Sequence, residues 1–285
     1  MNKNILLSKK TTLIIAVVLL AFLIIGSIFD FSISKALYHE NDVAMFFAGY
    51  GEYPAYLGIL VGGYLLVLGH NKEKKGIAIL QIIGGCIGIA FGAAMVFVNP
   101  IMYTRIPKVI SIPFGICCIV LVILLTRKLC KGARREDIIR VGAAFFFTVL
   151  FEILAVNIIK QPWGRPRMRL IARDVGAYFT PWWKPGTELK DMLVAAGIAK
   201  DEFRSFPSGH TANAVLLVQA GLLSHLDGQL EKRRTLLVSI GLIWGAIVAL
   251  SRIIMGAHFL SDTVIGMTIG LCTVLIVNKV VFKNA

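Results

Sequence analysis

The chain is divided into eight long apolar blocks that are separated by short charged segments. The blocks run over 13–29, 53–68, 77–98, 109–125, 141–159, 207–224, 236–253 and 259–280. A helix of about 20 apolar residues is long enough to cross a hydrocarbon core of roughly 30 Å. Helices are expected because lipid offers no hydrogen-bond partner to an exposed backbone, and no alternating barrel pattern is present. The sequence therefore predicts an all-α polytopic transmembrane bundle of about eight spans.

The overall composition agrees with this architecture. The chain is 57% hydrophobic and 16% charged, with a mean hydropathy of +0.77. A soluble domain has about 45–50% apolar and roughly 25% charged residues, so a soluble globular enzyme does not fit. The net charge of +14 would suggest nucleic acid as the partner of a soluble protein. In a membrane chain the distribution of the charge decides, and we expect the bilayer as partner and no nucleic acid.

The basic residues alternate between the two sides of the predicted bundle. One set of connections holds most of them: Lys3, Lys9, Lys10, Lys72, Lys74, Lys75, Arg127, Lys128, Lys131, Arg134, Arg135, Arg140, Lys232, Arg233, Arg234, Lys279 and Lys283. The short connections of the other side hold only Lys35, Arg105, Lys108 and Arg252. Because Lys and Arg are enriched in cytoplasmic connections, both termini are predicted to be cytoplasmic.

One connection does not follow this rule. The segment 160–206 is predicted on the outer side, yet it carries nine basic residues. It is also the only connection large enough for a lid or a small subdomain. Its basic excess requires a chemical explanation.

Three polar motifs lie where apolar blocks begin or end on the predicted outer side. They are KQPWGRPR at 160–167, FPSGH at 206–210 and SRIIMGAHFLSD at 251–262. Charged residues at membrane depth are costly and usually functional. The alternation of the spans places all three motifs on one face.

The cations of these motifs suit an oxyanion. The guanidinium groups of Arg167 and Arg252 match phosphate oxygens bidentately, and Lys160 adds a point charge. Pro207 precedes an apolar helical run, so the amides of Ser208 and Gly209 are expected to lie free at a helix N-terminus, where an anion is favoured. The set predicts a site for a phosphoryl group.

The histidines of the motifs predict the chemistry at that phosphoryl group. His210 follows the anion site directly, and His258 and Asp262 are one helical turn apart. We expect the carboxylate to accept the Nδ1 proton of His258, which leaves Nε2 as a nucleophile. This is the orienting logic of a catalytic triad applied to histidine.

These motifs resemble the signature of the type 2 phosphatidic acid phosphatase superfamily, which includes glucose-6-phosphatase-like enzymes and vanadium haloperoxidases. The family pattern is Lys, six residues, Arg-Pro; then Pro-Ser-Gly-His; then Ser-Arg, five residues, His, three residues, Asp. The chain matches this pattern at Lys160, Arg167, Pro207, Ser208, Gly209, His210, Ser251, Arg252, His258 and Asp262. Met168 stands where the family usually has Pro.

The resemblance implies a role for each matched residue. His258 would attack phosphorus to give a phosphohistidine, Asp262 would orient it, and His210 would protonate the leaving oxygen and later activate water. The phosphoryl oxygens would be held by Lys160, Arg167, Ser208, Gly209 and Arg252. The resemblance implies no metal and no other cofactor.

The resemblance also implies a division of the chain. The catalytic helical core would occupy 141–285, with 160–206 as its outer loop. The family usually has three spans before the first motif, whereas five are predicted here. We therefore expect residues 1–140 to contain an extra helix pair.

Active residues at the outer interface suit an amphiphile whose tail stays in the bilayer. We expect a lipid phosphate or diphosphate as substrate, with undecaprenyl diphosphate first and phosphatidic acid or phosphatidylglycerol phosphate as alternatives. A soluble phosphate ester and a lipid phosphotransferase, which passes the phosphoryl group to an acceptor lipid, are also compatible. The Lys-rich, compact chain indicates a bacterial plasma membrane, and the oligomeric state stays open.

Other polar residues are expected to be structural. Arg165, Arg169 and Arg173 are interpreted as solvated interfacial charge rather than as substrate contacts. Glu152 and Asn157 lie inside the block 141–159 and are expected to make interhelical hydrogen bonds.

Overall fold

The computed structural model describes residues 6–283 and is all-helical over that range. Lys3 of the basic N-terminal cluster lies outside the described residues. The elements are α1 (Lys9–Leu37), α2 (Asp42–Tyr50), α3 (Tyr53–Gly69), α4 (Lys75–Tyr103), α5 (Lys108–Leu129), α6 (Arg135–Trp163), α7 (Met168–Ile171), α8 (Thr187–Ala195), η1 (Lys200–Phe203), α9 (Gly209–Val215), η2 (Leu216–His225), η3 (Gly228–Arg233), α10 (Arg234–Ile254) and α11 (Leu260–Val281).

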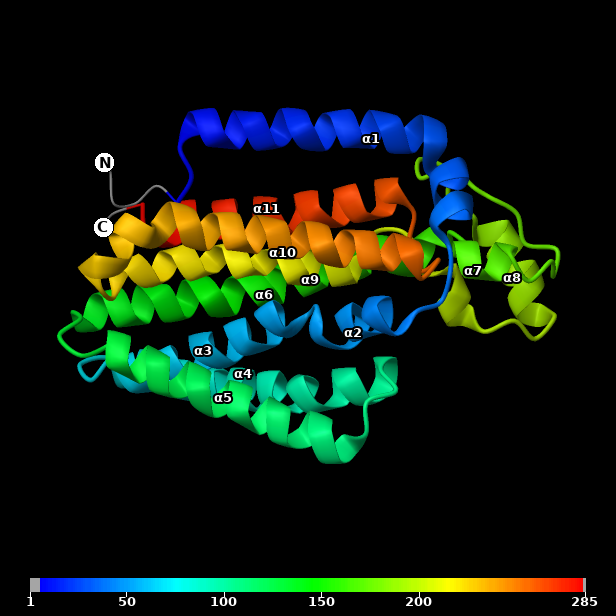
Figure 1. Ribbon diagram of the computed structural model, residues 1–285. Coiled ribbons are helices and arrows are strands. Elements are labelled where there is room, and N and C mark those ends of the chain that lie inside the picture. The colour runs from blue at the N-terminus through cyan, green and yellow to red at the C-terminus, as the bar shows by residue number, and fades with distance from the viewer. Residues whose placement is uncertain (1–5, 284–285) are drawn as a thin grey trace.

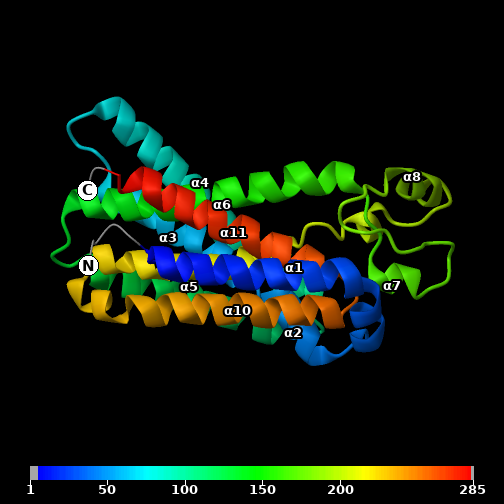
Figure 2. The ribbon, with the colours of Figure 1, turned by 90° about the horizontal axis from the view of Figure 1, so that it is seen from above.

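The long helices lie side by side in one elongated bundle (Figure 1). α3 packs against α4 and α6, α10 against η2, and α11 against α9 and α6. The start of α1 and the end of α11 lie at one end of the bundle, and α7 and α8 lie at the other (Figures 1 and 2). The polar motifs are therefore gathered at the end that is far from the start of α1 and the end of α11.

Seven helical segments of the described chain are long and apolar enough to cross a membrane. The expected all-α architecture is thereby confirmed. The block 207–224 differs from the expectation of a single helix, because it forms seven residues of α-helix in α9 and ten of 3₁₀-helix in η2. With rises of about 1.5 and 2.0 Å per residue, the two together extend about 30 Å. The tighter winding compensates for the small number of residues.

Glycines allow the helices of the N-terminal half to approach closely. A Cβ on Gly63 of α3 would stand 2.4 Å from the carbonyl oxygen of Gly85 on α4, and one on Gly62 would stand 2.6 Å from the amide nitrogen of Phe146 on α6. Small residues at such crossings bring backbones into van der Waals contact, which drives helix association in lipid. α3 is the buried centre of this half of the bundle.

The connection 160–206 forms a small helical subdomain at the end of the bundle (Figure 1). Gly164, with a φ of 70°, ends α6 in the left-handed conformation that favours glycine. α7, α8 and η1 then enclose an apolar cluster of their own, made of Leu170, Leu189, Leu193 and Phe203. This subdomain fixes the basic residues of the first motif against the bundle.

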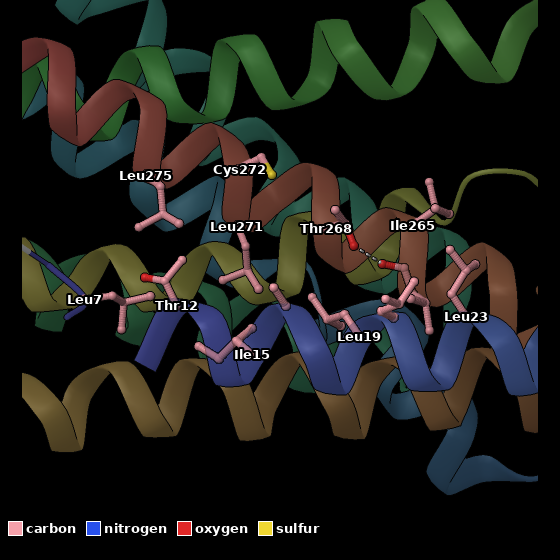
Figure 3. Close-up of a pocket in the computed structure, with 13 residues that line it drawn as sticks. Leu7, Thr12, Ile15, Leu19, Leu23, Ile265, Thr268, Leu271, Cys272 and Leu275 are labelled. Carbon is pink, nitrogen blue, oxygen red and sulfur yellow. Dashed lines mark hydrogen bonds between the residues drawn. The ribbon is translucent and has the colours of Figure 1, made fainter. Parts of the chain in front are cut away.

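α1 lies along the outside of the bundle and packs mainly on α11. Over its first half the two helices enclose an apolar cavity of about 260 Å³, lined by residues such as Leu19 and Leu271 (Figure 3). Near its other end the contact is close, because a Cβ on Gly26 would stand 2.9 Å from the amide nitrogen of Ser261. α1 is therefore held most firmly where α11 begins.

Candidate active site

The three motifs meet around one cavity of about 300 Å³ at the subdomain end of the bundle. Of the predicted site residues, Lys160, Arg167, Gly209, His210 and His258 line this cavity. Ser208, Arg252 and Asp262 are buried beside these residues but do not line the cavity. Met168, which stands at the family's Pro position, begins α7 and is buried.

His258 is held by a backbone carbonyl. Its Nδ1 lies 2.5 Å from the carbonyl oxygen of Ser205 and 3.9 Å from Oδ2 of Asp262. Because a carbonyl only accepts, Nδ1 carries the proton and Nε2 keeps its lone pair. The prediction that Asp262 accepts the Nδ1 proton directly is wrong in this structure, although the predicted tautomer is the one that the contact requires.

Asp262 is occupied by other donors. Its Oδ2 accepts from the amide of Phe259 at 2.8 Å and from the hydroxyl of Ser205 at 2.6 Å, and its Oδ1 accepts from Arg165. The first contact caps the N-terminus of α11, where a carboxylate is favoured. Asp262 therefore positions His258 through Ser205, the residue whose carbonyl holds the ring.

Arg165 is fully buried at the centre of this network, so its interpretation as solvated interfacial charge is wrong. Its Nε donates to the carbonyl of Thr180 at 2.8 Å, Nη1 donates to Ser261 and Asp262, and Nη2 donates to Asp30 at 2.9 Å. The guanidinium carbon also lies 4.3 Å from the ring centroid of Phe259. Two carboxylates and an aromatic face offset the cost of burying this cation.

Asp30 of α1 completes the network and was not found from the sequence. Its carboxylate accepts from Arg165, from the amide of Ser261 at 2.9 Å and from the Ser261 hydroxyl. The available signal was an acidic residue at the end of the first apolar block, where a charge is costly. The N-terminal helix thus supplies a carboxylate that holds Arg165.

His210 also receives support from the N-terminal half. Its Nε2 lies 3.5 Å from Oε2 of Glu52, which directly precedes α3, and its ring makes a hydrogen bond with the backbone of Ala48 on α2. Glu52 is buried and also accepts from Tyr56 at 2.8 Å and Asn213 at 2.7 Å. Glu52 was not predicted as a site residue from the sequence, in which it is an acidic residue at the start of an apolar block.

The predicted phosphate-binding cations have free donor capacity. Nε and Nη1 of buried Arg252 have no hydrogen-bond partner among the described residues, and the same holds for Nε of Arg167. Nη1 of Arg167 pairs with Asp201 at 2.9 Å. Unpaired donors of this kind are costly to bury and are suited to bind an anion.

The expectation of two free amides at 208–209 holds only in part. The amide of Ser208 is not free, because it donates to the backbone carbonyl of Asp262 at 3.0 Å. The first intrahelical bond of α9 is donated by Ala212 to the carbonyl of Ser208. The amides of Gly209 and His210 precede that bond, so helix geometry leaves them without an intrahelical acceptor.

Burial and nearby charge set the protonation state of His258. Burial, followed by the cations Lys160, Arg167 and Arg252, lowers the pKa of His258 well below its ordinary value. The imidazole is therefore neutral near pH 7, which is the state in which Nε2 acts as a nucleophile.

The other polar residues of the region differ in their contacts and exposure. Arg169 pairs with Glu202 at 2.9 Å, and Arg173 is largely exposed. Asn157 donates to the carbonyl of Ile153 on its own helix and accepts from Arg204 of the subdomain. Oε2 of Glu152 has no hydrogen-bond partner in the described chain, so the interhelical bond expected for it is not formed.

Comparison with known proteins agrees with the motifs. The sequence profile of the PAP2 superfamily matches residues 141–285. The chain belongs to the PAP2 superfamily. The resemblance to the type 2 phosphatidic acid phosphatases is thereby confirmed. The matched residues include His210, His258, Asp262 and Arg165 but neither Asp30 nor Glu52.

A curated relative is similar to half of the chain. It is the lipid A 1-phosphatase of Rhizobium johnstonii, which is 29% identical over 148 residues, or 50% of each chain. This PAP2 protein therefore spans about half the length of the curated relative that it matches. No solved structure matches the chain.

Proposed function

We propose that this protein is an integral membrane phosphatase that hydrolyses a lipid phosphate or diphosphate. One observation carries the proposal: His258 and His210 face a common cavity with their ring centroids 6.5 Å apart, and Nδ1 of His258 is held by the Ser205 carbonyl. Two histidines beside unpaired cations are suited to nucleophilic attack on a phosphoryl group and to proton transfer.

The reaction follows from this arrangement. Nε2 of His258 attacks phosphorus, the bond to the leaving oxygen breaks, and His210 donates its proton to that oxygen. Water then attacks the phosphohistidine, His210 takes the proton of the water, and inorganic phosphate leaves. Lys160, Arg167 and Arg252, with Ser208 and Gly209 at the start of α9, stabilise the charge on the phosphoryl oxygens. The step needs no metal.

Glu52 lies beside the second histidine, His210. A carboxylate 3.5 Å from Nε2 of His210 partly offsets the burial and the nearby cations that disfavour the protonated imidazole, which is the form that donates to the leaving oxygen. We therefore assign the catalytic groups to 141–285 and positioning groups to 1–140, with 160–206 as the outer loop over the site.

The proposed topology has eight spans, cytoplasmic termini and an active site on the outer face of a bacterial plasma membrane. The location of the described chain ends opposite the subdomain supports it (Figure 2). The basic clusters near those ends support the cytoplasmic assignment.

Two substrate classes fit the proposal. Undecaprenyl diphosphate is the first candidate from the sequence, because its tail stays in the bilayer while its charged end reaches the cations. The similarity to a lipid A 1-phosphatase favours a phosphorylated glycolipid as the second. Transfer of the phosphoryl group from His258 to an acceptor lipid is the alternative reaction.

Phosphate release by the purified chain in detergent with EDTA tests the proposal. The substrates are undecaprenyl diphosphate, phosphatidic acid, phosphatidylglycerol phosphate and glucose 6-phosphate. We expect release from a lipid, and loss of release together with loss of an acid-labile phosphoprotein in His258→Ala. Release only after acceptor lipids are added would favour the phosphotransferase, and loss in EDTA that a divalent ion restores would refute the metal-free step.

A further inference from the structure

Glu152 is a buried carboxylate that the proposed reaction does not use. It lies on α6, has 1% of its surface exposed and lines the cavity of the active site. Its Oε2 has no hydrogen-bond partner in the described chain. An unpartnered ionisable group at membrane depth is expensive and indicates a function.

Glu152 lines the cavity at a distance from Lys160. It precedes Lys160 by eight residues on the same helix, which places the two Cα atoms about 12 Å apart along the helix axis. The phosphoryl site is at the Lys160 end, near the subdomain. The cavity therefore continues from the phosphoryl site into the bundle.

A second unpartnered acceptor lines the same inner part. Nδ2 of Asn213 donates to Oε1 of Glu52 at 2.7 Å, so Oδ1 is the free atom, and it has no partner in the described chain. Asn213 is buried and lines the cavity with Glu52 and Glu152. Oδ1 of Asn213 only accepts, and the buried carboxyl of Glu152 accepts when ionised and can donate when protonated, so a group that both donates and accepts satisfies the two residues in either state.

We propose that Glu152 and Asn213 bind hydroxyl groups of the alcohol that carries the substrate's phosphoryl group. Glu52 holds the Asn213 amide in place through its hydrogen bond. A hydroxyl fits better than an ammonium group, because a hydroxyl both donates and accepts a hydrogen bond, whereas an ammonium group only donates. The inference rests on the proposed phosphatase function and narrows its substrate class. It favours phosphorylated sugar lipids and phosphatidylglycerol phosphate over prenyl phosphates and phosphatidic acid, whose alcohols bring no donor.

The first arm of the test compares substrates. kcat/KM is measured for phosphatidylglycerol phosphate and for phosphatidic acid with the full chain in nanodiscs. We expect the wild type to prefer the hydroxyl-bearing substrate, and Glu152→Leu to reduce that preference about tenfold, as expected for loss of a buried hydrogen bond. Glu152→Gln keeps one acceptor oxygen and a similar shape, so it should reduce the preference less.

Gln219→Leu is the matched control. Gln219 is equally buried, has no partner for its side-chain amide in the described chain and lines a different cavity. Its replacement should leave the substrate preference unchanged. An equal fall in kcat/KM for both substrates in Glu152→Leu would overturn the inference.

The second arm measures binding without turnover. Phosphatidylglycerol and diacylglycerol are titrated into the wild type and Glu152→Leu. We expect the Kd of phosphatidylglycerol alone to rise about tenfold in the variant. An unchanged Kd would overturn the inference. Absence of hydrolysis from every lipid would refute the proposed phosphatase function, and the binding measurement alone would then test whether Glu152 binds a hydroxyl group.

Discussion

Replacement of Arg165 by lysine separates a positioning role from substrate contact. Arg165 donates from Nε to Thr180, from Nη1 to Ser261 and Asp262, and from Nη2 to Asp30. Lysine keeps the charge but has one nitrogen, so it cannot span two carboxylates and a carbonyl on three sides. At least two hydrogen bonds of a fully buried cation are lost, each contributing roughly 1.5–3 kcal/mol. We expect a loss of stability of about 3 kcal/mol, the lower limit of that sum.

The same change should lower kcat rather than raise KM. Arg165 does not line the cavity, but it holds Asp262, which in turn holds Ser205 and its contact with His258. A loss of about 1.4–2.7 kcal/mol in transition-state stabilisation corresponds to a fall in kcat of about 10- to 100-fold. Arg169→Lys, which alters a partly exposed ion pair with Glu202, serves as the control and should change stability by less than about 1 kcal/mol.

The assay combines unfolding of the detergent-solubilised chain with phosphate-release kinetics. A raised KM with unchanged kcat would show that Arg165 binds substrate and would refute the positioning role. Asp30→Asn, alone and combined with Arg165→Lys, measures the coupling of the buried pair, and we expect an interaction free energy of about 0.5–3 kcal/mol. Additive effects would show that Asp30 does not act through Arg165.

Three further outcomes follow from the geometry. The acid limb of the pH profile of kcat/KM should lie below the ordinary histidine pKa of about 6.5. Burial and cations lower the pKa of His258, so its neutral form persists at lower pH. A limb centred above about 6.5 would contradict the assignment of His258 as nucleophile. Ser205→Ala removes the hydroxyl that donates to Asp262 but keeps the carbonyl that holds His258, so kcat should fall about tenfold with KM unchanged. An unchanged kcat would show that Asp262 does not position His258 through Ser205. Gly26→Leu should displace α1 from α11 and lower both thermal stability and kcat. Gly84→Leu is the control, because its side chain meets open space, and it should change neither quantity. Equal effects of the two variants would show that the close contact of α1 with α11 is not critical.

The helices could be predicted because the membrane leaves few alternatives. Long apolar blocks correspond to seven helical segments of the described chain, and the block 207–224 differs only in its winding. Its change to 3₁₀-helix was not predictable, because no residue pattern distinguishes it from an α-helix of the same composition. In the structure this segment packs against α10 and α11, and these contacts are not visible in the pattern of its own residues.

The residues of the motifs could be assigned to one site, but their contacts could not. The four-residue spacing of His258 and Asp262 is equally compatible with a direct bond and with a capped helix N-terminus. The cap is formed, because Asp262 is the third residue of α11 and its carboxylate reaches the amide of Phe259. The neighbouring donors Ser205 and Arg165 then occupy its remaining oxygen sites.

The supporting carboxylates could not be found from spacing, because they come from remote parts of the chain. Asp30 and Ser261 are 231 residues apart in sequence, and Glu52 and Asn213 are 161 apart. The two acids act on different histidines. Asp30 acts on His258 indirectly, through Arg165 and Asp262, whereas Glu52 lies directly beside His210. Both acids lie outside the residues that match the superfamily. The N-terminal helices are therefore part of the site's electrostatics, because without them Arg165 would keep one buried counter-charge and His210 would face cations alone.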